Sequence, residues 1–452
     1  MHIVIIGGGK VGRELAANIH KKNHSVVIVE KDPVTAKELG KTLDVLVINQ
    51  DGANMATLEK ANISSADIFI AVTQIDELNL MACMMADRAK VPTTIARVRN
   101  PESHRNIADT GFSKEEIGVD YVINPERAVA LEISRMIHYP EAADIEYFSK
   151  DKVMMLSITV SEKAEMTGQN LQEMPLPKGC IVVGIKRPDG SFIVPSGKDI
   201  VKPDDKVYLI GNVKVMRKAS WLFHHEDKRI RKVVILGGGT VGYTLAQMLE
   251  NNSGPKFQVK LVEKDLKRCE ELKRNLHKTV ILQGDSSELT YYNEEEISEA
   301  DVLVTVTEDD RTNIIAAIMG EKLGCNKIIS GISNNEYTYV YAAAGIDNYV
   351  NPYLMTAYKI LRFTRKGDLR NLSHLKGEDA EVLELVVPGS CKVAGKKIVD
   401  ANFPKGMLIG TIVRGEEIII PHGDTVLEPD DDLVIFALTK ISNKLDAYFC
   451  RA

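Results

Sequence analysis

Two glycine-rich turns, one in each half of the chain, have the spacing that binds the phosphates of a nucleotide. Residues 2–12 read HIVIIGGGKVG and residues 231–242 read RKVVILGGGTVG, so each apolar run leads into a G-x-G-x-x-G pattern. The first glycine of this pattern permits a tight turn, the second lets the backbone approach a pyrophosphate, and the third lets the helix pack closely on the strand. The phosphates then face free N–H groups at the positive end of the helix dipole. The glycines are Gly7, Gly9 and Gly12 in the first turn and Gly237, Gly239 and Gly242 in the second.

An acidic residue follows each turn after about 20 residues, as dinucleotide-binding folds require. Glu30 ends the run HSVVIVE and Glu263 ends FQVKLVE. A carboxylate at the tip of the second strand accepts hydrogen bonds from the ribose hydroxyls and repels a 2′-phosphate, which favours NAD or adenosine phosphates over NADP. The alternative is a glycine turn in an α/β protein that holds no ligand.

Composition excludes several classes of function. The chain has 452 residues and a net charge of −6, so no basic surface indicates nucleic-acid binding. Its six cysteines form no CxxC pair, which favours a reducing cytosol and predicts neither a disulfide framework nor a zinc site. We expect no signal peptide. No apolar run approaches the ~20 residues that span a bilayer, so we expect any membrane connection to come through a partner.

The first third of the chain alternates between strand and helix patterns. Apolar β-branched runs predict strands at 2–6, 25–30, 44–48, 67–72, 94–98 and 119–123, with helices at about 10–22, 33–41, 53–60, 77–90 and 101–110. This alternation predicts a parallel, doubly wound α/β sheet. Asn124 and Pro125 suit the N-cap and first position of a further, largely apolar helix that runs to about Tyr139. Short strands separated by the turns Pro188-Asp189-Gly190 and Pro203-Asp204-Asp205 then predict a small β-rich domain.

The second half repeats this order of elements. ADIFIAVTQIDELNLMAC (66–83) corresponds to ADVLVTVTEDDRTNIIAA (300–317), and the segment SFIVPSGKDIVKPDDKVYLI (191–210) corresponds to EIIIPHGDTVLEPDDDLVIF (417–436). The sequence therefore predicts two Rossmann-like domains, each followed by a small α+β domain. The expected boundaries are 1–124 for the first Rossmann domain, 125–145 for a crossover helix, 146–222 for the first small domain, 223–231 for a linker, 232–350 for the second Rossmann domain, 351–375 for a second crossover helix and linker, and 376–452 for the second small domain.

The ordered set of motifs resembles the regulator-of-potassium-conductance domain, abbreviated RCK and also called KTN. The motifs are IIGGGKVG with IVEKD, the NQDG segment at 49–52, FIAVTQIDELN, IARVRNP at 95–101 and the Pro-Asp-Asp turn of each small domain. In tandem and at this length, they resemble the cytosolic regulatory subunits of Trk potassium-uptake systems. The resemblance implies a protein that is not an enzyme and whose nucleotide domains bind NAD(H) or ATP/ADP. It also implies a homo-oligomeric ring, expected to be tetrameric, on the inner face of the membrane, where it alters the activity of a TrkH- or TrkG-like potassium-conducting subunit.

The resemblance and the position along the fold assign further candidate residues. Lys10 and Val11 lie in the first turn, where the ammonium of Lys10 meets a terminal phosphate unless it is an ordinary surface lysine. Asp51 and Asp285 follow the third strands, near the expected adenine edge, with turn formation as the alternative. The remaining candidates are Lys31, Gly52, Thr73, Gln74, Asn79 and Arg97 in the first copy, with Arg99 beside them, and Thr240, Val241, Lys264, Thr307, Glu308 and Asn313 in the second.

The two sites are expected to be unequal. Lys10 is replaced by the neutral Thr240 in the second turn, and the stretch KIISGIS offers Ser330 and Ile332 where the first copy has Arg97 and Arg99. A guanidinium fork suits phosphate. We therefore expect the first site to take the more highly charged ligand.

A dehydrogenase and a calcium-binding protein are the alternatives to a regulatory role. A dehydrogenase needs an acid or base set against the nicotinamide, but the first small domain carries no histidine, and the ten histidines of the chain have no metal-ligand spacing. The acidic runs 294–296, 308–310 and 430–432 could hold calcium. They fit a solvated helix start or turn better, and we expect no metal site.

Overall fold

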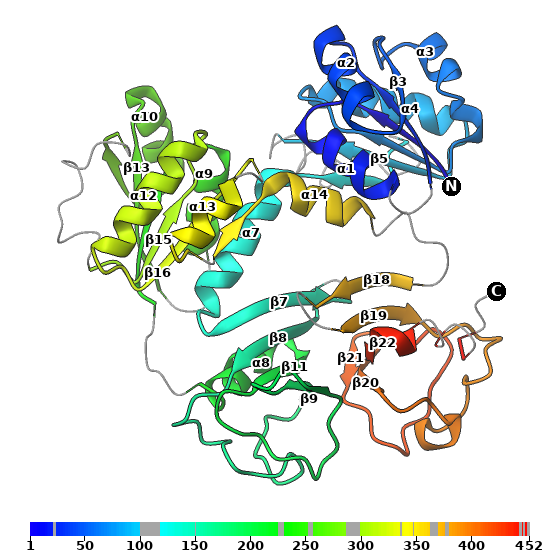
Figure 1. The fold of residues 1–452 in the computed structure, drawn as a ribbon, viewed down its shortest axis with the longest axis vertical. Helices are drawn as coiled ribbons and strands as arrows, with labels where there is room; N and C mark the ends of the chain where they lie inside the picture. Colours follow the sequence, from blue (N-terminus) through cyan, green and yellow to red (C-terminus); the bar gives the residue numbers. More distant parts are fainter. Residues whose placement is uncertain are drawn as a thin grey trace. The chain divides into compact units, whose positions relative to one another are not determined.

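The computed structural model describes most of the chain (Figure 1). The described residues are 1–20, 24–99, 118–149, 151–224, 230–251, 256–285, 299–334, 337–346, 348–361, 369–375, 379–442, 445 and 448–449. They form two compact units, Met1–Ile137 with Ile230–Thr364 and His138–Arg229 with Arg365–Ala452. The helix expected at 101–110 and parts of both expected linkers lie outside the described residues. No helix in the described part of the chain combines the length and apolarity needed to cross a bilayer.

The first unit contains two six-stranded parallel sheets of identical topology, which confirms the predicted fold class. The first sheet has the order β3-β2-β1-β4-β5-β6 and the second β14-β13-β12-β15-β16-β17. The chain reverses direction of winding between β1 and β4, and between β12 and β15, where doubly wound folds bind ligands. The strands are β1 (His2–Ile6), β2 (Ser25–Val29), β3 (Leu46–Ile48), β4 (Ile68–Ala71), β5 (Thr93–Arg97), β6 (Tyr121–Ile123), β12 (Lys232–Leu236), β13 (Gln258–Glu263), β14 (Val280–Gln283), β15 (Val302–Thr305), β16 (Lys327–Gly331) and β17 (Tyr349–Val350).

Helices cover both faces of each sheet because the central strands are apolar on both sides. Residues 3–6 of β1 and 68–71 of β4 are all buried. The helices of the first sheet are α1 (Lys10–His20), α2 (Pro33–Thr42), α3 (Met55–Lys60) and α4 (Asp76–Arg88), and those of the second are α9 (Thr240–Glu250), α10 (Leu266–Asn275), α12 (Asp310–Lys322) and α13 (Thr338–Ala343).

Each sheet is also packed by a helix that follows the other sheet in the sequence. Helix α7 (Pro125–His138) leaves the first sheet, yet Val129, Ile133 and Ile137 are buried in one apolar cluster with strands β12 and β15. Helix α14 (Pro352–Leu361) leaves the second sheet, yet Ala357 and Ile360 are buried with the first copy's strands and helix α1. Figure 1 shows α7 beside α9 and α14 beside α1. The two crossover helices are therefore exchanged between the copies.

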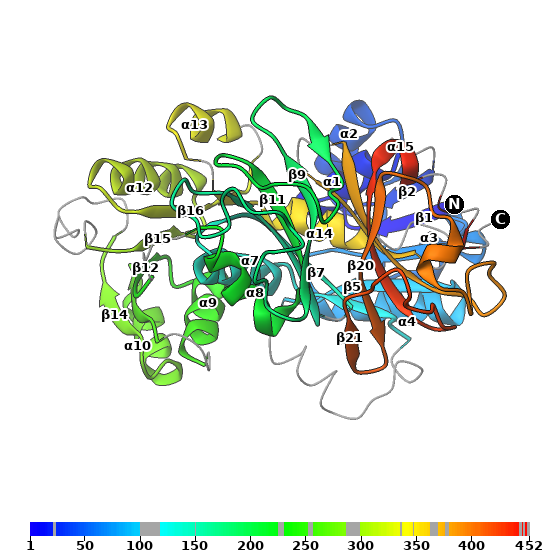
Figure 2. The same ribbon diagram turned by 90° about the horizontal axis from the view of Figure 1, so that it is seen from below.

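The second unit is built from two five-stranded antiparallel sheets that share a core. The first has the order β10-β9-β11-β8-β7 and the second β18-β19-β22-β20-β21. Met155, Val183 and Ile210 of the first sheet lie in one buried cluster with Val434 and Phe436 of the second, and Figure 2 shows the sheets side by side. The strands are β7 (Ala142–Phe148), β8 (Val153–Thr159), β9 (Cys180–Lys186), β10 (Phe192–Ile193), β11 (Lys206–Asn212), β18 (Leu369–His374), β19 (Ala380–Val386), β20 (Met407–Arg414), β21 (Glu417–Ile419) and β22 (Asp432–Leu438); α8 (Val213–Trp221) and α15 (Thr439–Ser442) follow β11 and β22.

Both small sheets begin earlier in the sequence than expected. Helix α7 ends at His138, and strand β7 starts at Ala142, before the expected boundary at 146. The helix ends close to the expected Tyr139, and Pro140 explains the end, since proline cannot continue a helix. Strand β18 likewise starts at Leu369, within the segment expected to be crossover helix and linker.

The Pro-Asp-Asp turn of each small domain buries its second aspartate against an arginine. Asp431 has no exposed surface, and its two carboxylate oxygens accept hydrogen bonds from Arg414 Nε at 2.8 Å and Nη2 at 2.9 Å. Asp205 is equally buried and pairs with Arg187. The preceding Asp430 adopts a left-handed φ of 67°. The motif therefore closes each small domain through a buried ion pair.

The acidic run at 308–310 has a capping role. Asp309 is the N-cap of α12, and its carboxylate accepts hydrogen bonds from the backbone N–H groups of Arg311 and Thr312. The hydroxyl of Thr312 also donates to this carboxylate, and this hydrogen bond and the one from Thr312 N lower the pKa of Asp309. The run 430–432 belongs to the turn just described, and the run 294–296 lies outside the described residues.

Candidate functional site

The two glycine turns have the geometry that the fingerprint predicts. Gly7 has a φ of 100° and Gly237 a φ of 108°, backbone conformations that residues other than glycine rarely adopt. A Cβ atom at Gly12 would lie 1.9 Å from the carbonyl oxygen of Gly7, so α1 approaches the turn as closely as backbone allows. A Cβ at Gly9 would meet nothing within 4 Å. The middle glycine of each fingerprint is thus free of packing constraints, which leaves its surface open to a ligand.

The acidic residue at the end of each second strand accepts a hydrogen bond from the backbone of the glycine turn. Glu30 Oε2 accepts a hydrogen bond from Gly8 N at 2.6 Å, and Oε1 accepts one from Asp32 N at 2.7 Å. Glu263 repeats both contacts, with Gly238 N at 2.8 Å and Asp265 N at 2.9 Å. A carboxylate offers about four lone-pair positions, so each keeps acceptor capacity for ribose hydroxyls.

The fingerprint did not predict a role for the middle residue of each GGG run, Gly8 or Gly238. A side chain there would meet closer neighbours than a side chain at the glycine that follows. A Cβ at Gly8 would lie 2.3 Å from Leu39 Cδ1, and one at Gly238 would lie 2.6 Å from Leu272 Cδ1. Helices α2 and α10 therefore press against the turns. Three consecutive glycines in both copies were the available signal.

Lys31, Asp51 and Gly52 lie together at the carboxyl edge of the first sheet. Lys31 Nζ lies 3.0 Å from Asp51 Oδ2, and the N–H of Ala53 donates to Asp51 Oδ1. The Ala53 N–H and, after it, the Lys31 ammonium lower the pKa of Asp51. Gly52 packs on the end of β1, because a Cβ there would lie 2.2 Å from Ile6 Cγ2. In the second copy, Lys264 is exposed and Asp285 is half-buried.

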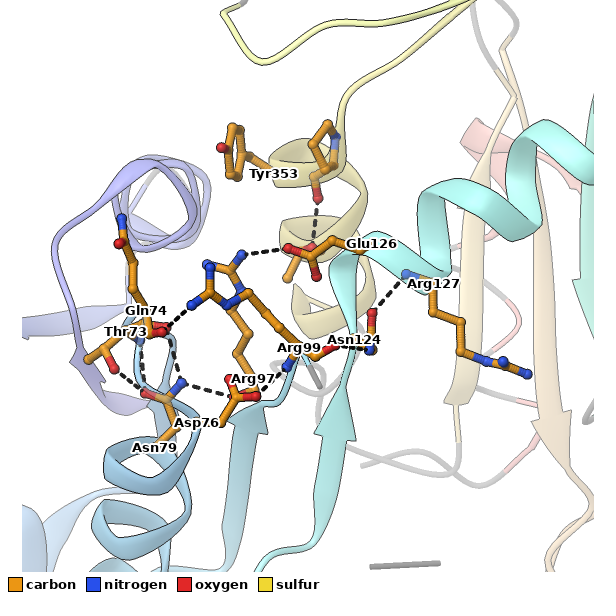
Figure 3. Close-up of polar contacts among 12 residues, drawn as sticks. Thr73, Gln74, Asp76, Asn79, Arg97, Arg99, Asn124, Glu126, Arg127 and Tyr353 are labelled. Carbon is orange, nitrogen blue, oxygen red and sulfur yellow. Dashed lines mark hydrogen bonds and ion pairs between the residues drawn. The ribbon is translucent and has the colours of Figure 1, made fainter. Parts of the chain in front are cut away.

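The loop after β4 lies against the glycine turn and is held by a buried amide. A Cβ at Gly7 would lie 3.0 Å from Thr73 N. The fully buried Asn79 accepts hydrogen bonds from Thr73 N and Oγ1 and donates to the carbonyls of Thr73 and Arg97 (Figure 3). Asn313 makes the same contacts with Thr307 and Gly331. These asparagines tie two loops together; Gln74 and Glu308 beside them are exposed.

Replacing Asn79 with alanine should lower the free energy of unfolding by about 2 kcal/mol, since it leaves buried donors and acceptors without partners. Asn313→Ala should cost a similar amount in the second copy. Chemical denaturation of the full chain measures both. Gln74→Ala, at an exposed neighbour, is the matched control and should be neutral. Equal stability of the Asn79→Ala protein and the unmodified chain would contradict this role.

Arg97 is paired with a carboxylate in the structure. Its Nη2 lies 3.1 Å from Glu126 Oε1 (Figure 3), and the two side chains are 9% and 19% exposed, respectively. Arg97 Nε and Glu126 Oε2 are buried without a hydrogen-bond partner. Arg99 donates to the carbonyl of Gln74, and its own backbone N–H donates to Asp76. A phosphate at this edge of the sheet would therefore compete with Glu126 for Arg97.

The second copy lacks both arginines, but the register differs from the expected one. Asn313 contacts the carbonyl of Gly331 as Asn79 contacts that of Arg97, and Asp310 accepts from Ser333 N as Asp76 accepts from Arg99 N. The counterparts are thus Gly331 and Ser333, and the assignment to Ser330 and Ile332 was wrong by one residue. With Gly331 and Ser333 at these two positions, the second copy still has no guanidinium group where the first copy has Arg97 and Arg99.

Two residues near the turns were not predicted because they come from distant parts of the sequence. Arg268 of α10 donates from Nε to the carbonyl of Gly238 at 2.9 Å, and its guanidinium lies 5.7 Å from the Tyr243 ring centroid. Tyr353 of α14 places its ring 5.3 Å from Lys10 Nζ in the other copy's turn. Lys10 and Thr240 are exposed, whereas Val11 is buried and Val241 half-buried, so the valines face the core rather than a ligand.

Family models match nearly the whole chain in a repeated order. The TrkA-N domain matches residues 3–125 and 233–352, and the TrkA-C domain matches 155–224 and 382–449. Two relatives are "Trk system potassium uptake protein TrkA homolog 1" of Methanosarcina mazei, 33% identical over 99% of this chain and 100% of its own length, and the TrkA homolog of Archaeoglobus fulgidus, 33% identical over the same shares. The protein called TrkA in Vibrio alginolyticus is 32% identical over 97% of this chain and 96% of its length.

Solved structures have the same fold. The crystal structure of the GsuK RCK domain matches with a TM-score of 0.62 and 19% identity over 100% of this chain and 95% of that chain. A structure titled "GsuK channel bound to NAD" matches with a TM-score of 0.61 and 19% identity, covering 100% of this chain and 79% of that one.

Proposed function

Because the chain belongs to the TrkA family of Trk-system potassium-uptake proteins, we propose that it is the nucleotide-sensing regulatory subunit of a potassium-uptake system. The observation that supports this proposal is that both glycine turns have the geometry expected of a phosphate-binding turn. Each has an exposed or half-buried glycine, Gly9 or Gly239, next to a buried glycine whose N–H donates to the carboxylate of Glu30 or Glu263. Two such turns in one chain fit a protein that senses ligands at two sites.

NAD(H) is the proposed ligand of both turns, with ATP or ADP as further ligands of the first. Glu30 and Glu263 suit unphosphorylated ribose, and a related channel of the same fold is described as bound to NAD. Lys10 adds a positive charge at the first turn, where the second has only Thr240. A terminal phosphate therefore gains more at the first site, and the second favours the dinucleotide.

Nucleotide binding regulates through a difference in affinity between two shapes of the assembly. A ligand shifts such an equilibrium only by its differential affinity for the two shapes, and a coupling of ~1–3 kcal/mol is typical. The proposed partner is a TrkH- or TrkG-like membrane subunit, with copies of this chain forming a ring, tetrameric in our proposal, on the inner face of the membrane.

We assign no catalytic role to the chain. Hydride transfer requires an acid or base beside the nicotinamide. Among the candidate residues in the first glycine turn, the ionisable side chain is that of Lys10, and its ammonium contacts the Tyr353 ring. The relatives quoted above are named for potassium uptake. Turnover of NAD with any added metabolite would restore the dehydrogenase alternative.

Potassium flux into vesicles that contain the membrane partner tests the proposal. Adding this protein with saturating nucleotide should change the flux, and exchanging NAD for ATP should change it again. Mass spectrometry of nucleotide that co-purifies with the native assembly identifies the occupant. Unchanged flux with and without the protein at saturating nucleotide would reject the regulatory role.

A further inference from the structure

The two crossover helices begin with the same Asn-Pro pair, and a different residue follows that pair in each copy. VINPE ends at Glu126 at the start of α7, and YVNPY ends at Tyr353 at the start of α14. Asparagine caps both helices: Asn124 Oδ1 accepts from Arg127 N, and Asn351 Oδ1 accepts from Tyr353 N at 2.9 Å. The asparagine cap is thus shared, whereas the residue after the proline is Glu126 in one copy and Tyr353 in the other.

The exchange of helices places Tyr353 at the first nucleotide turn. Ala357 and Ile360, one and two turns further along α14, are buried among the first copy's core residues. They anchor α14 against α1, and the half-buried Tyr353 ring then lies 5.3 Å from Lys10 Nζ. Glu126 takes a different partner, Arg97, on its own sheet.

An aromatic ring restrains an ammonium without neutralising it. The face of the ring carries negative electrostatic potential that attracts the cation, while the ammonium keeps donors for an anion. Lys10 is exposed and its stem is flexible, so an unrestrained side chain would lose entropy on contacting a phosphate. Contact with the Tyr353 ring already restricts the Lys10 side chain, so less side-chain entropy is lost when the ligand binds.

We propose that Tyr353, supplied by the second copy, is a specificity-determining residue of the first nucleotide site, because it positions Lys10 toward the terminal phosphate of a nucleoside triphosphate. This inference rests on the proposed nucleotide binding. NAD has no terminal phosphate and gains nothing from a positioned Lys10. The tyrosine therefore raises the preference of the first site for ATP over NAD.

Calorimetric titration of ATP and NAD into the full chain tests the inference, with Gly239→Asp present throughout so that the first site is measured. Tyr353→Leu should weaken ATP binding by about threefold to fivefold, the range of a cation–π contact near a surface, and change NAD binding less than twofold. Tyr353→Phe keeps the ring and should keep the preference. Tyr339→Leu, at a tyrosine that is 82% exposed in α13, is the matched control.

A double-mutant cycle with Lys10→Met separates positioning from helix packing. Once Lys10 is absent, Tyr353→Leu should have no further effect on ATP. A purely structural role would instead weaken ATP and NAD equally and persist in the Lys10→Met background, and that result would overturn the inference. Failure of the starting protein to bind either nucleotide would reject the proposed function itself, which is a different outcome from an unchanged ATP-to-NAD ratio.

Discussion

Replacing Gly9 with aspartate is expected to weaken nucleotide binding at the first site by about 100-fold or more, since like charges brought together cost several kcal/mol. The added carboxylate would stand where the pyrophosphate must approach. The fold should survive, because a Cβ at Gly9 meets nothing within 4 Å. Calorimetry measures the loss as one fewer bound nucleotide per chain, with an unchanged melting temperature.

Two matched variants sharpen this expectation. Gly239→Asp should remove the second site alone, since a Cβ there also meets nothing within 4 Å. Gly12→Ala should act differently, because its Cβ would lie 1.9 Å from the oxygen of Gly7 and must displace α1. It should therefore lower the melting temperature as well as the affinity. If neither aspartate variant changes nucleotide affinity, the assigned sites are wrong.

Removing the buried aspartate of the second Pro-Asp-Asp turn should cause the largest loss of stability. Asp431→Ala leaves Arg414 without its two-point partner and removes the acceptor of Glu428 N. Breaking a fully buried pair costs ~3–5 kcal/mol. Arg414 is 32% exposed, so water replaces part of the lost contact and we expect about 3 kcal/mol.

The neighbouring residue offers a control for this prediction. Asp430 is exposed and has a left-handed φ of 67°, a conformation that glycine adopts without strain. Asp430→Gly should therefore leave stability unchanged or raise it slightly. Denaturant unfolding followed by Trp221, the one tryptophan of the chain and part of the second unit, measures both variants. Equal midpoints for Asp431→Ala and Asp430→Gly would contradict the role of the ion pair.

Local sequence patterns predicted most of the fold. The alternation of apolar strands and amphipathic helices gave the two parallel sheets, and Asn124 caps α7 as expected. The resemblance to RCK domains and to Trk regulatory subunits is confirmed by the family models and relatives. Helix α7 ends at His138, close to the expected end at about Tyr139, just before Pro140.

The site was less predictable because its contacts join residues far apart in sequence. The spacing of Glu30 after the glycine turn was visible, but its hydrogen bond to Gly8 follows only from the strand order. Nothing in the local pattern indicates that Arg97 faces Glu126 or that Tyr353 reaches Lys10. The residues assigned to nucleotide contact stay predictions until a ligand is bound.

The exchanged helices have a consequence for how the two halves depend on each other. Either half alone would expose an apolar helix and leave a groove on its own sheet, so two separate halves could satisfy those surfaces only by pairing. The duplicated polypeptide holds the contacts of such a homodimer at a fixed one-to-one stoichiometry. Covalent linkage guarantees that each half always meets its counterpart, and substitutions can accumulate in one half without being imposed on the other. Unequal sites, such as those marked by Lys10 and Thr240, can arise under that arrangement.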